Sequence, residues 1–202
     1  MTDAEYFESA YQGRPPWDIG APQPELLALL DEFPPEGPAL DVGCGTGTLS
    51  LALAERGLTV LGVDLAAGAI EQARAKALAA APEVGARVRF EAGDALHPSR
   101  LPGPFGAVVD SGFFHLFGPQ EREGFAREVA QALRTGGRYY LLGFAIGSPY
   151  PNSPREVRQG ELRALFAPER GWRVLVLRTA RIHTRSPLGE VPATAACVER
   201  VF

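Results

Sequence analysis

Short apolar runs alternate with amphipathic stretches over most of this chain. Apolar or strictly alternating runs predict strands, and apolar positions three or four residues apart predict helices. The predicted strands before residue 145 cover residues 39–42, 59–64, 87–91, 105–110 and 138–144. The predicted helices there cover residues 24–33, 49–56, 67–80 and 120–133, the last one ending at Gly136-Gly137. Because helices separate the strands, the pattern predicts an α/β fold with a parallel sheet and right-handed crossovers.

The C-terminal part follows a different pattern. Residues 154–166 are predicted to form a helix, and residues 172–184 and 193–202 are predicted strands. The turn sequence Ser186-Pro187-Leu188-Gly189 joins these strands, and its residue types favour a chain reversal. We therefore expect an antiparallel hairpin at one edge of the sheet. Residues 1–20 are rich in aromatic residues, glycine and proline, and no strand is predicted there.

Length and charge exclude several classes of partner. The 202 residues fit one domain, and the net charge is −4 with scattered arginines, so no basic face for nucleic acid is expected. No apolar run approaches the ~20 residues of a membrane span. The first residues lack the order of a secretion signal, which predicts a cytoplasmic protein with no membrane partner. The oligomeric state stays open.

Cysteine and lysine are both rare in this chain. Cys44 and Cys197 do not form a CxxC pair, so no zinc site, and no metal of any kind, is predicted. Lys76 is the only lysine among 20 basic residues, which we interpret as a compositional bias rather than a functional signal.

The segment Asp41-Val42-Gly43-Cys44-Gly45-Thr46-Gly47 leaves a buried strand and opens a helix. Glycines allow a sharp turn and a close approach to a ligand, and the free N–H groups of the helix favour an anionic group. A dinucleotide site has the pattern G-x-G-x-x-G, but Thr48 stands where its third glycine belongs. An NAD oxidoreductase is therefore disfavoured.

The segment from Asp41 to Gly47 resembles motif I of the class I S-adenosylmethionine (SAM)-dependent methyltransferases. Val63-Asp64, Gly93-Asp94-Ala95 and the turn at residues 133–137 resemble three further family features in the family's order, and together the matches cover about residues 37–145. The resemblance implies a Rossmann-like sheet of seven strands in the order 3-2-1-4-5-7-6. It also implies an antiparallel seventh strand and helices on both faces.

The resemblance further implies which residues bind SAM. Asp64 corresponds to the acid that binds both ribose hydroxyls, and Asp94 corresponds to the acid that holds the adenine amino group. The full set implied for the cofactor is Trp17, Asp41, Gly43, Cys44, Gly45, Gly47, Asp64, Leu65, Asp94, Ala95, Asp110 and Ser111.

Several short segments restrict the class of molecule that could accept the methyl group. Asp110-Ser111-Gly112-Phe113 lacks the prolines of the nucleic-acid amino-methylating branch, and Gly143-Phe144 offers no second metal ligand. The W-D-x-G patch at residues 17–20 and the D-S-G-x-F-H patch at residues 110–115 are similar to those of thiopurine and tellurite-type small-molecule methyltransferases. This second resemblance implies a small-molecule substrate.

The candidate acceptor residues each have a plainer alternative. The candidates to line the substrate pocket are Tyr11, Trp17, Phe113 and Phe114. The first two could instead hold the N-terminal arm, residues 1–20, against the core, and the two phenylalanines could be core residues. His115 is the candidate catalytic residue, as a general base or an orienting donor. The alternative, which we favour, is a structural histidine beside the cofactor loop.

These observations predict one domain, residues 1–202, with direct in-line transfer of the SAM methyl group to a small molecule. Within it, residues 1–36 form an N-terminal lid and helix, residues 37–145 the cofactor-binding core, and residues 146–202 the C-terminal helix and hairpin. A quinone-type C-methyltransferase and a SAM-binding protein without transfer activity remain as alternatives.

Overall fold

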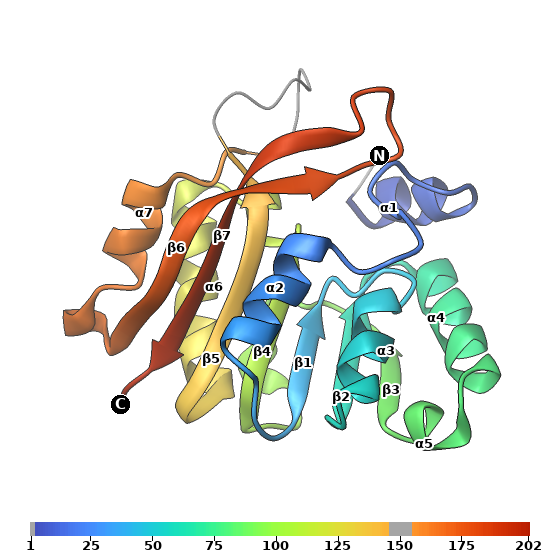
Figure 1. Ribbon diagram of the computed structural model, residues 1–202, viewed down its shortest axis with the longest axis horizontal. Helices are drawn as coiled ribbons and strands as arrows, with labels where there is room; N and C mark the ends of the chain where they lie inside the picture. Colours follow the sequence, from blue (N-terminus) through green and yellow to red (C-terminus); the bar gives the residue numbers. More distant parts are fainter. Residues whose placement is uncertain (1–2, 146–154) are drawn as a thin grey trace.

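Seven strands form a single sheet in the order β3-β2-β1-β4-β5-β7-β6 (Figure 1). The computed structural model describes residues 3–145 and 155–202. The strands are β1 (Ala39–Val42), β2 (Val60–Asp64), β3 (Val88–Ala92), β4 (Phe105–Ser111), β5 (Leu133–Phe144), β6 (Trp172–His183) and β7 (Glu190–Arg200). Strands β1 to β5 pair in parallel, and β7 pairs antiparallel with β5 and β6. The predicted strand order and antiparallel seventh strand are confirmed.

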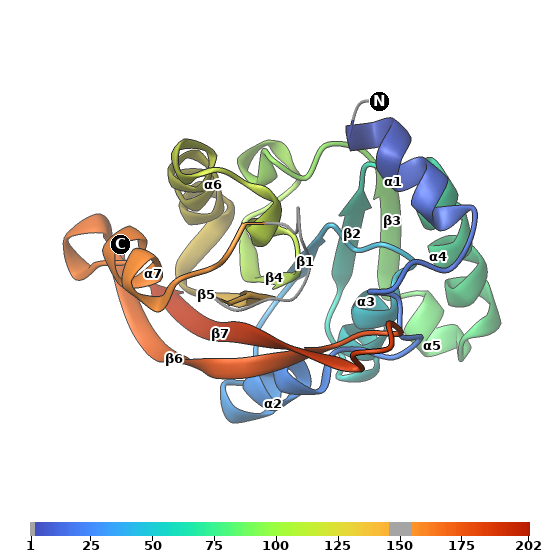
Figure 2. The same ribbon diagram turned by 90° about the horizontal axis from the view of Figure 1, so that it is seen from above.

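Helices cover both faces of the sheet. They are α1 (Asp3–Tyr11), α2 (Pro24–Glu32), α3 (Thr48–Glu55), α4 (Ala67–Ala79), α5 (Pro82–Gly85), α6 (Pro119–Ala132) and α7 (Gln159–Leu165). Figure 2 shows α2 and α3 on one face and α6 on the other. Along β5, Tyr139 and Leu141 join the core under α6, whereas Tyr140 and Leu142 join the core under α2. Strand pleating sends alternate side chains to opposite faces, so one buried strand serves both cores.

Three predicted boundaries differ from the structure. The helix predicted for residues 154–166 begins only at Gln159; Pro154 lies outside the described residues, and Val157 instead donates its N–H to the carbonyl of Phe144 at 2.6 Å. Helix α6 ends at Ala132, so Gly136-Gly137 lies within β5 rather than ending the helix. Strand β7 starts at Glu190, before the predicted residue 193, because the hairpin continues beyond the sheet.

Helix α1 was not predicted from the sequence. Its Phe7 and Tyr11 lie one turn apart and pack against Ala66 and Ala69, which is the i, i+4 spacing of a helix face. Figure 1 places α1 at the edge where β1 and β2 end. The arm that precedes the sheet therefore begins as a helix docked at the carboxyl ends of the strands.

The β6–β7 hairpin reaches past the same edge. Strand β5 ends its pairing with β7 at the Phe144–Ala193 pair, but β6 and β7 stay paired as far as His183 and Glu190. The tip of the hairpin consequently approaches the N-terminal arm, as Figure 1 shows. Within the part of the chain that the structure describes, no helix has the length and apolar character to cross a membrane.

Candidate active site

The glycine loop between β1 and α3 lies at the point where the strand order reverses between β1 and β4, which is where open α/β sheets bind ligands. Gly45 has a φ of +52°, and a Cβ there would lie 2.6 Å from the Tyr11 hydroxyl. Gly47 has a φ of +76°, and a Cβ there would lie 2.6 Å from the Phe90 ring. Positive φ and close approach both require glycine, so the motif is explained by local geometry.

Asp64 at the end of β2 joins this loop to the next helix. Its carboxylate accepts hydrogen bonds from Gly45 N at 2.8 Å and from Ala66 N at 2.9 Å. Burial raises the pKa of Asp64, and the N–H donors oppose that shift. Each carboxylate oxygen has more than one acceptor site, so Asp64 keeps the capacity to accept hydroxyl donors from a ligand. The neighbouring Leu65 side chain is exposed.

The loop after β3 presents the second acidic position. Asp94 is exposed and accepts a hydrogen bond from Leu96 N at 2.8 Å, while Ala95 is buried. Asp94, Asp64 and the glycine loop all lie at the carboxyl edge of the sheet. This edge therefore presents two carboxylates and the backbone of a tight turn. These groups fit a nucleoside, whose hydroxyl and amino groups are donors for carboxylates.

Asp41 and Asp110, both predicted to bind the cofactor, lie beneath the loops with almost no exposed surface. Asp41 accepts a hydrogen bond from the Ser50 hydroxyl at 2.6 Å. Burial raises the pKa of Asp41 to about 7 and that of Asp110 to about 6. The two carboxyl groups therefore stabilise the segments that follow β1 and β4 by accepting hydrogen bonds from them. Ser111, next to Asp110, is exposed.

Asp110 organises the turn that follows β4. Its carboxylate accepts hydrogen bonds from Phe113 N at 2.7 Å, Phe114 N at 2.9 Å and the Tyr139 hydroxyl at 2.8 Å. The turn places the Phe113 ring against Gly43. It sends the Phe114 ring into the core, where that ring has no exposed surface. Of the two phenylalanines predicted to line the substrate pocket, the structure brings only Phe113 to the glycine loop.

His115 is buried and stacked on Phe144, with ring centroids 4.6 Å apart and planes 12° apart. Its Nδ1 accepts a hydrogen bond from Phe144 N at 3.4 Å. Burial, and secondarily the charge of Arg122, lowers the pKa of His115 to about 3. The imidazole is therefore neutral at pH 7, and its unprotonated nitrogen faces a backbone donor.

The N-terminal arm carries Tyr11 and Trp17 to the glycine loop. The Trp17 indole N–H donates to the Tyr11 hydroxyl at 3.1 Å, and the Tyr11 carbonyl accepts a hydrogen bond from the Gln72 side chain at 3.1 Å. Burial raises the pKa of the Tyr11 phenol well above its usual value. Trp17 is 38% exposed, so it presents an aromatic surface at this edge.

Sequence reasoning missed several residues that hold the arm in place. Glu8 accepts hydrogen bonds from Gly68 N at the start of α4, at 3.1 and 3.2 Å. Asp18 accepts a hydrogen bond from the Thr46 hydroxyl at 3.0 Å, and Lys76 donates to the same hydroxyl. Asp18 belongs to the W-D-x-G patch, in which the sequence predicts a role for the tryptophan alone, and the sequence-based interpretation of Lys76 is compositional bias. The isolated lysine was the available signal.

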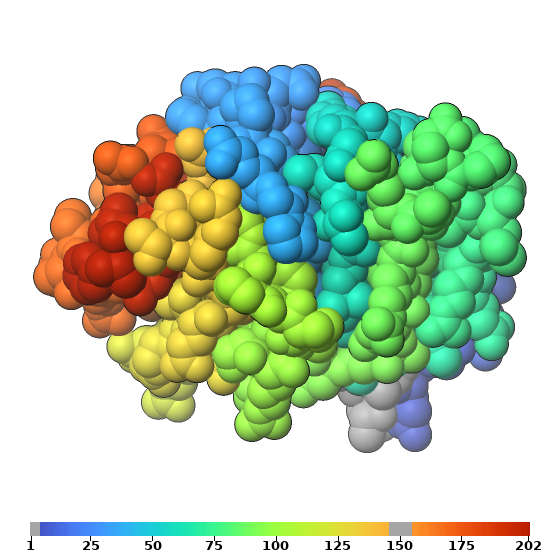
Figure 3. Space-filling view, turned by 90° about the horizontal axis from the view of Figure 1, so that it is seen from below, coloured from blue at the N-terminus to red at the C-terminus, as the bar shows by residue number. Residues whose placement is uncertain are grey.

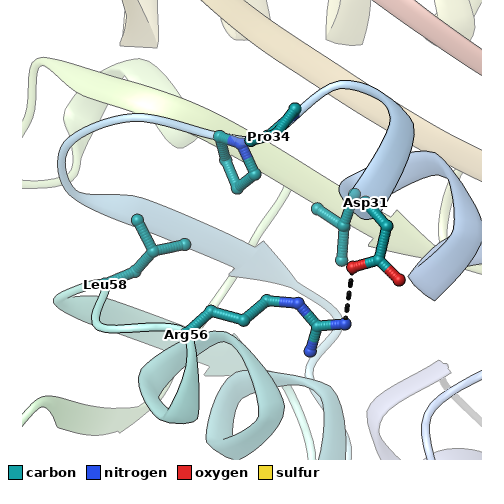
Figure 4. Close-up of a pocket in the computed structure, with 6 residues that line it drawn as sticks. Asp31, Pro34, Arg56 and Leu58 are labelled. Carbon is teal, nitrogen blue, oxygen red and sulfur yellow. Dashed lines mark hydrogen bonds and ion pairs between the residues drawn. The ribbon is translucent and has the colours of Figure 1, made fainter.

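Two pockets on the described part of the protein lie away from this edge. One, of about 280 Å³, lies between α2 and α3 and contains the Arg56–Asp31 ion pair (Figure 4). Its lining residues Pro35 and Leu58 precede β1 and β2 in the chain, so it lies toward the amino ends of those strands. Figure 3 shows the molecule from below. The other, of about 540 Å³, lies beside α4, α5 and β3. Among the described residues, no group of three or more His, Cys, Asp or Glu side chains could hold a metal ion.

Known proteins resemble this chain at several levels. A family described as a methyltransferase domain matches residues 39–137. A 2-heptyl-1-hydroxyquinolin-4(1H)-one methyltransferase of Mycobacteroides abscessus is 35% identical over 189 residues, which is 89% of this chain and 81% of that protein. An Arabidopsis thaliana protein named "Probable thiol methyltransferase 2" is 29% identical over 157 residues, or 77% of this chain and 68% of that protein.

One solved structure is similar over almost the whole chain. It comes from work on the conversion of a disulfide bond into a thioacetal group during echinomycin biosynthesis. The TM-score is 0.83 and the identity 32%, covering 98% of this chain and 92% of that one. The likeness therefore includes the arm and the hairpin as well as the glycine loop.

Proposed function

This chain belongs to the class I SAM-dependent methyltransferases, and from that premise we propose that it methylates a small molecule whose accepting heteroatom loses its proton without help from the enzyme. The chain is an enzyme, and SAM is its methyl donor. The observation that carries the proposal is the state of His115, whose unprotonated nitrogen accepts the Phe144 N–H.

We place SAM along the carboxyl ends of β1, β2 and β3. In this proposal the glycine loop lies against the methionine part, and Asp64 accepts hydrogen bonds from the ribose hydroxyls. Asp94 accepts a hydrogen bond from the adenine amino group, and the N–H of Ala95 donates to the adenine ring. Asp41 and Asp110 act from below through the loops they brace. The remaining contacts come from the residues named in the sequence analysis, namely Trp17, Gly43, Cys44, Gly45, Gly47, Leu65 and Ser111. Each carboxylate oxygen of Asp64 accepts one backbone N–H and has a further lone pair that can accept a hydroxyl, which supports this placement.

When bound, SAM would supply a methyl group on a sulfonium centre. The acceptor's lone pair would form a bond to the methyl carbon as the bond from that carbon to sulfur breaks, and S-adenosylhomocysteine would leave as a neutral thioether. The protein's part is to orient the two reactants and exclude water, and such positioning can supply roughly 7–11 kcal/mol of the barrier. We propose that Trp17, Tyr11 and Phe113 line the acceptor side. Their aromatic surfaces suit a flat apolar acceptor and a cationic sulfonium. Phe114 supports this wall from the core.

The candidate groups on the proposed acceptor side are poor proton acceptors. His115 has a pKa near 3. Asp110 has a pKa raised to about 6, but it has no exposed surface and already accepts three donors, so it does not reach an acceptor. Burial raises the pKa of the Tyr11 phenol, which therefore stays protonated. A general base works best when its pKa is near the working pH and its lone pair is within reach of the proton. The acceptor must then lose its proton to solvent.

An acceptor of that kind carries an acidic S–H or O–H group. A thiol, with a pKa of ~8.5, already contains a few per cent of thiolate at neutral pH. The relatives' names agree with this class, because one names a hydroxylated quinolone and the other names thiols. We therefore propose thiols and hydroxylated nitrogen heteroaromatics as the acceptors. Quinone-type C-methylation leaves a ring proton for a base to remove, which this arrangement does not favour.

A panel of acceptors with graded acidity tests the proposal. The enzyme is incubated with SAM and aryl thiols, alkyl thiols, hydroxyquinolones or simple phenols, products are identified by mass spectrometry, and kcat/KM is measured across pH. We expect the pH midpoint of kcat/KM to follow the pKa of each acceptor. One midpoint shared by all acceptors would reveal a base on the enzyme and contradict the proposal. Turnover of carbon acceptors alone would favour the quinone alternative.

A further inference from the structure

We propose that Asp18 is a positioning residue for methyl transfer, because Asp18, Thr46 and Lys76 form a latch that fixes the aromatic arm on the glycine loop and thereby sets how long SAM stays bound. This inference rests on the proposed SAM site. The name latch is used below for the side chains of these three residues.

The latch begins with a carboxylate whose two oxygens are both committed. One oxygen of Asp18 accepts a hydrogen bond from Gly20 N at 2.9 Å, and the other accepts one from the Thr46 hydroxyl at 3.0 Å. The Asp18 side chain is only 15% exposed, whereas that of Arg14 in the same turn is 51% exposed. Asp18 thus shapes the turn that carries Trp17 and also joins this turn to the glycine loop.

Thr46 is the central member of the latch. It lies between the second and third glycines of the loop and is 5% exposed. Its hydroxyl donates to Asp18 and accepts from the Lys76 ammonium at 2.5 Å, so its donor and one acceptor position are both used. Any movement of the arm that breaks the Asp18 contact leaves the loop's own hydroxyl with a missing partner.

Lys76 extends the latch to α4. Its ammonium also donates to the Thr48 hydroxyl at 3.1 Å, beside the amino end of α3. That end of a helix carries partial positive charge, so a cation there needs a compensating anion. Burial lowers the pKa of Lys76, the charge of Asp18 opposes that shift, and the charge of Arg14 adds to it. Asp18 therefore supplies the opposite charge beside a cation that contacts the loop and the helix.

The position of the only lysine supports a specific role. An ammonium is a compact charge with three donors that rotate freely, whereas a guanidinium is a wide planar fork. One nitrogen at 2.5 and 3.1 Å from two hydroxyls two residues apart in the chain suits the ammonium. In a chain whose other basic residues are all arginine, local geometry explains lysine here better than composition does.

The far side of the arm is anchored separately. The Gln23 amide donates to the carbonyl of His183 at 2.9 Å and accepts from its N–H at 2.8 Å. Arg185 N donates to the Pro16 carbonyl at 2.8 Å. The turn with Trp17 is thus held between the hairpin and the latch. Of these two anchors, only the latch bonds to the glycine loop, so it is the anchor whose release would free SAM.

The test compares SAM dissociation rates, measured by stopped-flow displacement, in the full chain and its variants. Asp18→Asn keeps the size of the side chain and removes its charge, and we expect SAM to leave about 10-fold faster, the effect of losing one charge-assisted hydrogen bond. The KM for SAM should rise more than the KM for the acceptor. Thr46→Val should act alike, while Thr46→Ser, which retains the hydroxyl, should restore the slow rate. The matched control is Asp31→Asn, which removes an exposed ion pair at the other end of the sheet.

The outcomes separate two failures. If wild-type protein binds no SAM, the proposed cofactor site is wrong. If wild-type protein binds SAM and Asp18→Asn releases it at the wild-type rate, the latch is overturned. If Asp18→Asn is too unstable to measure, the Thr46→Val and Thr46→Ser pair decides the question, because equal rates in those two variants also overturn it. In a double-mutant cycle, Asp18→Asn and Thr46→Val should be strongly non-additive; additive effects count against the latch.

Discussion

The carboxylate of Asp64 and the backbone N–H of Gly45 lie 19 positions apart in the chain and meet at 2.8 Å. This bond connects the end of β2 to the loop that follows β1. The same carboxylate also holds Ala66 N at the start of α4. One side chain thus shapes the glycine loop before any ligand arrives, and the groups that we propose to bind SAM are already arranged.

The first prediction concerns that side chain. Asp64→Ala removes the proposed acceptor for two ribose hydroxyls and leaves the N–H groups of Gly45 and Ala66 without it. Two hydrogen bonds to a charged group correspond to roughly 2–4 kcal/mol, or SAM binding weakened by about 30- to 1000-fold. Isothermal titration calorimetry measures the affinity, and circular dichroism checks the fold. A folded variant with wild-type affinity would mean that the site is misplaced.

Much of the fold could be predicted because burial leaves a direct trace in the sequence. The strand Ala39–Val42 is buried along its whole length and is an apolar run broken only by Asp41. Helix α1 could not be found in this way, since its apolar face consists mainly of Phe7 and Tyr11 and packs on a small separate cluster. The sequence predicts a helix at Val157, but its N–H bonds to the carbonyl of Phe144 in β5. The local sequence pattern does not reveal a contact with a residue 13 positions away.

The candidate site could be predicted by position along the chain but not by depth. The motifs locate four acids at or near the carboxyl ends of successive strands. In the structure Asp41, Asp64 and Asp110 lie in the last residues of β1, β2 and β4, and Asp94 lies two residues beyond β3. Whether a carboxylate lies on the surface or under a loop depends on which neighbours donate to it. The donors to Asp110 include the Tyr139 hydroxyl, 29 residues away. A local sequence pattern does not predict such a contact.

A second prediction separates the two roles considered for His115. His115→Phe keeps the stack on Phe144 and removes both ring nitrogens, whereas His115→Ala removes the ring as well. If His115 positions the turn, kcat at saturating SAM and acceptor stays within a few-fold of wild type in the Phe variant. The Ala variant should lose roughly 2–4 kcal/mol of stability through the cavity it leaves. A loss of about 10²–10⁴ in kcat in both variants would instead identify His115 as the base.

A third prediction concerns the arm as a whole. Deleting residues 1–20 removes Tyr11 and Trp17 from the glycine loop and Glu8 from the start of α4, but no strand of the sheet. The truncated protein should fold, bind SAM at least ~10-fold more weakly and fail to transfer methyl groups, because lids that close on the reactants exclude water. Product formation by mass spectrometry and SAM affinity by calorimetry give the readouts. Full turnover would show that the arm is not a lid.

The last prediction is a pH dependence of stability caused by Asp41. Its pKa is raised by burial to about 7 in the folded protein, against ~3.9 in an unfolded chain. Between those values the folded state holds a proton that the unfolded state has released, so stability falls as pH rises from about 4 to about 7. Below and above that window the contribution of Asp41 does not change.

Asp41→Asn removes this titration and retains a carbonyl acceptor for the Ser50 hydroxyl. The free energy of unfolding of the variant, relative to wild type, should therefore increase from pH 4 to pH 7 by roughly 2–4 kcal/mol and level off above pH 7, because a tenfold change in proton affinity corresponds to about 1.4 kcal/mol. Urea unfolding at several pH values measures the difference. Asp31→Asn is the control, because Asp31 is exposed and its difference from wild type should vary little over the same range. A flat difference for Asp41→Asn would mean that its carboxyl group is ionised throughout and that the Ser50 contact compensates fully for burial.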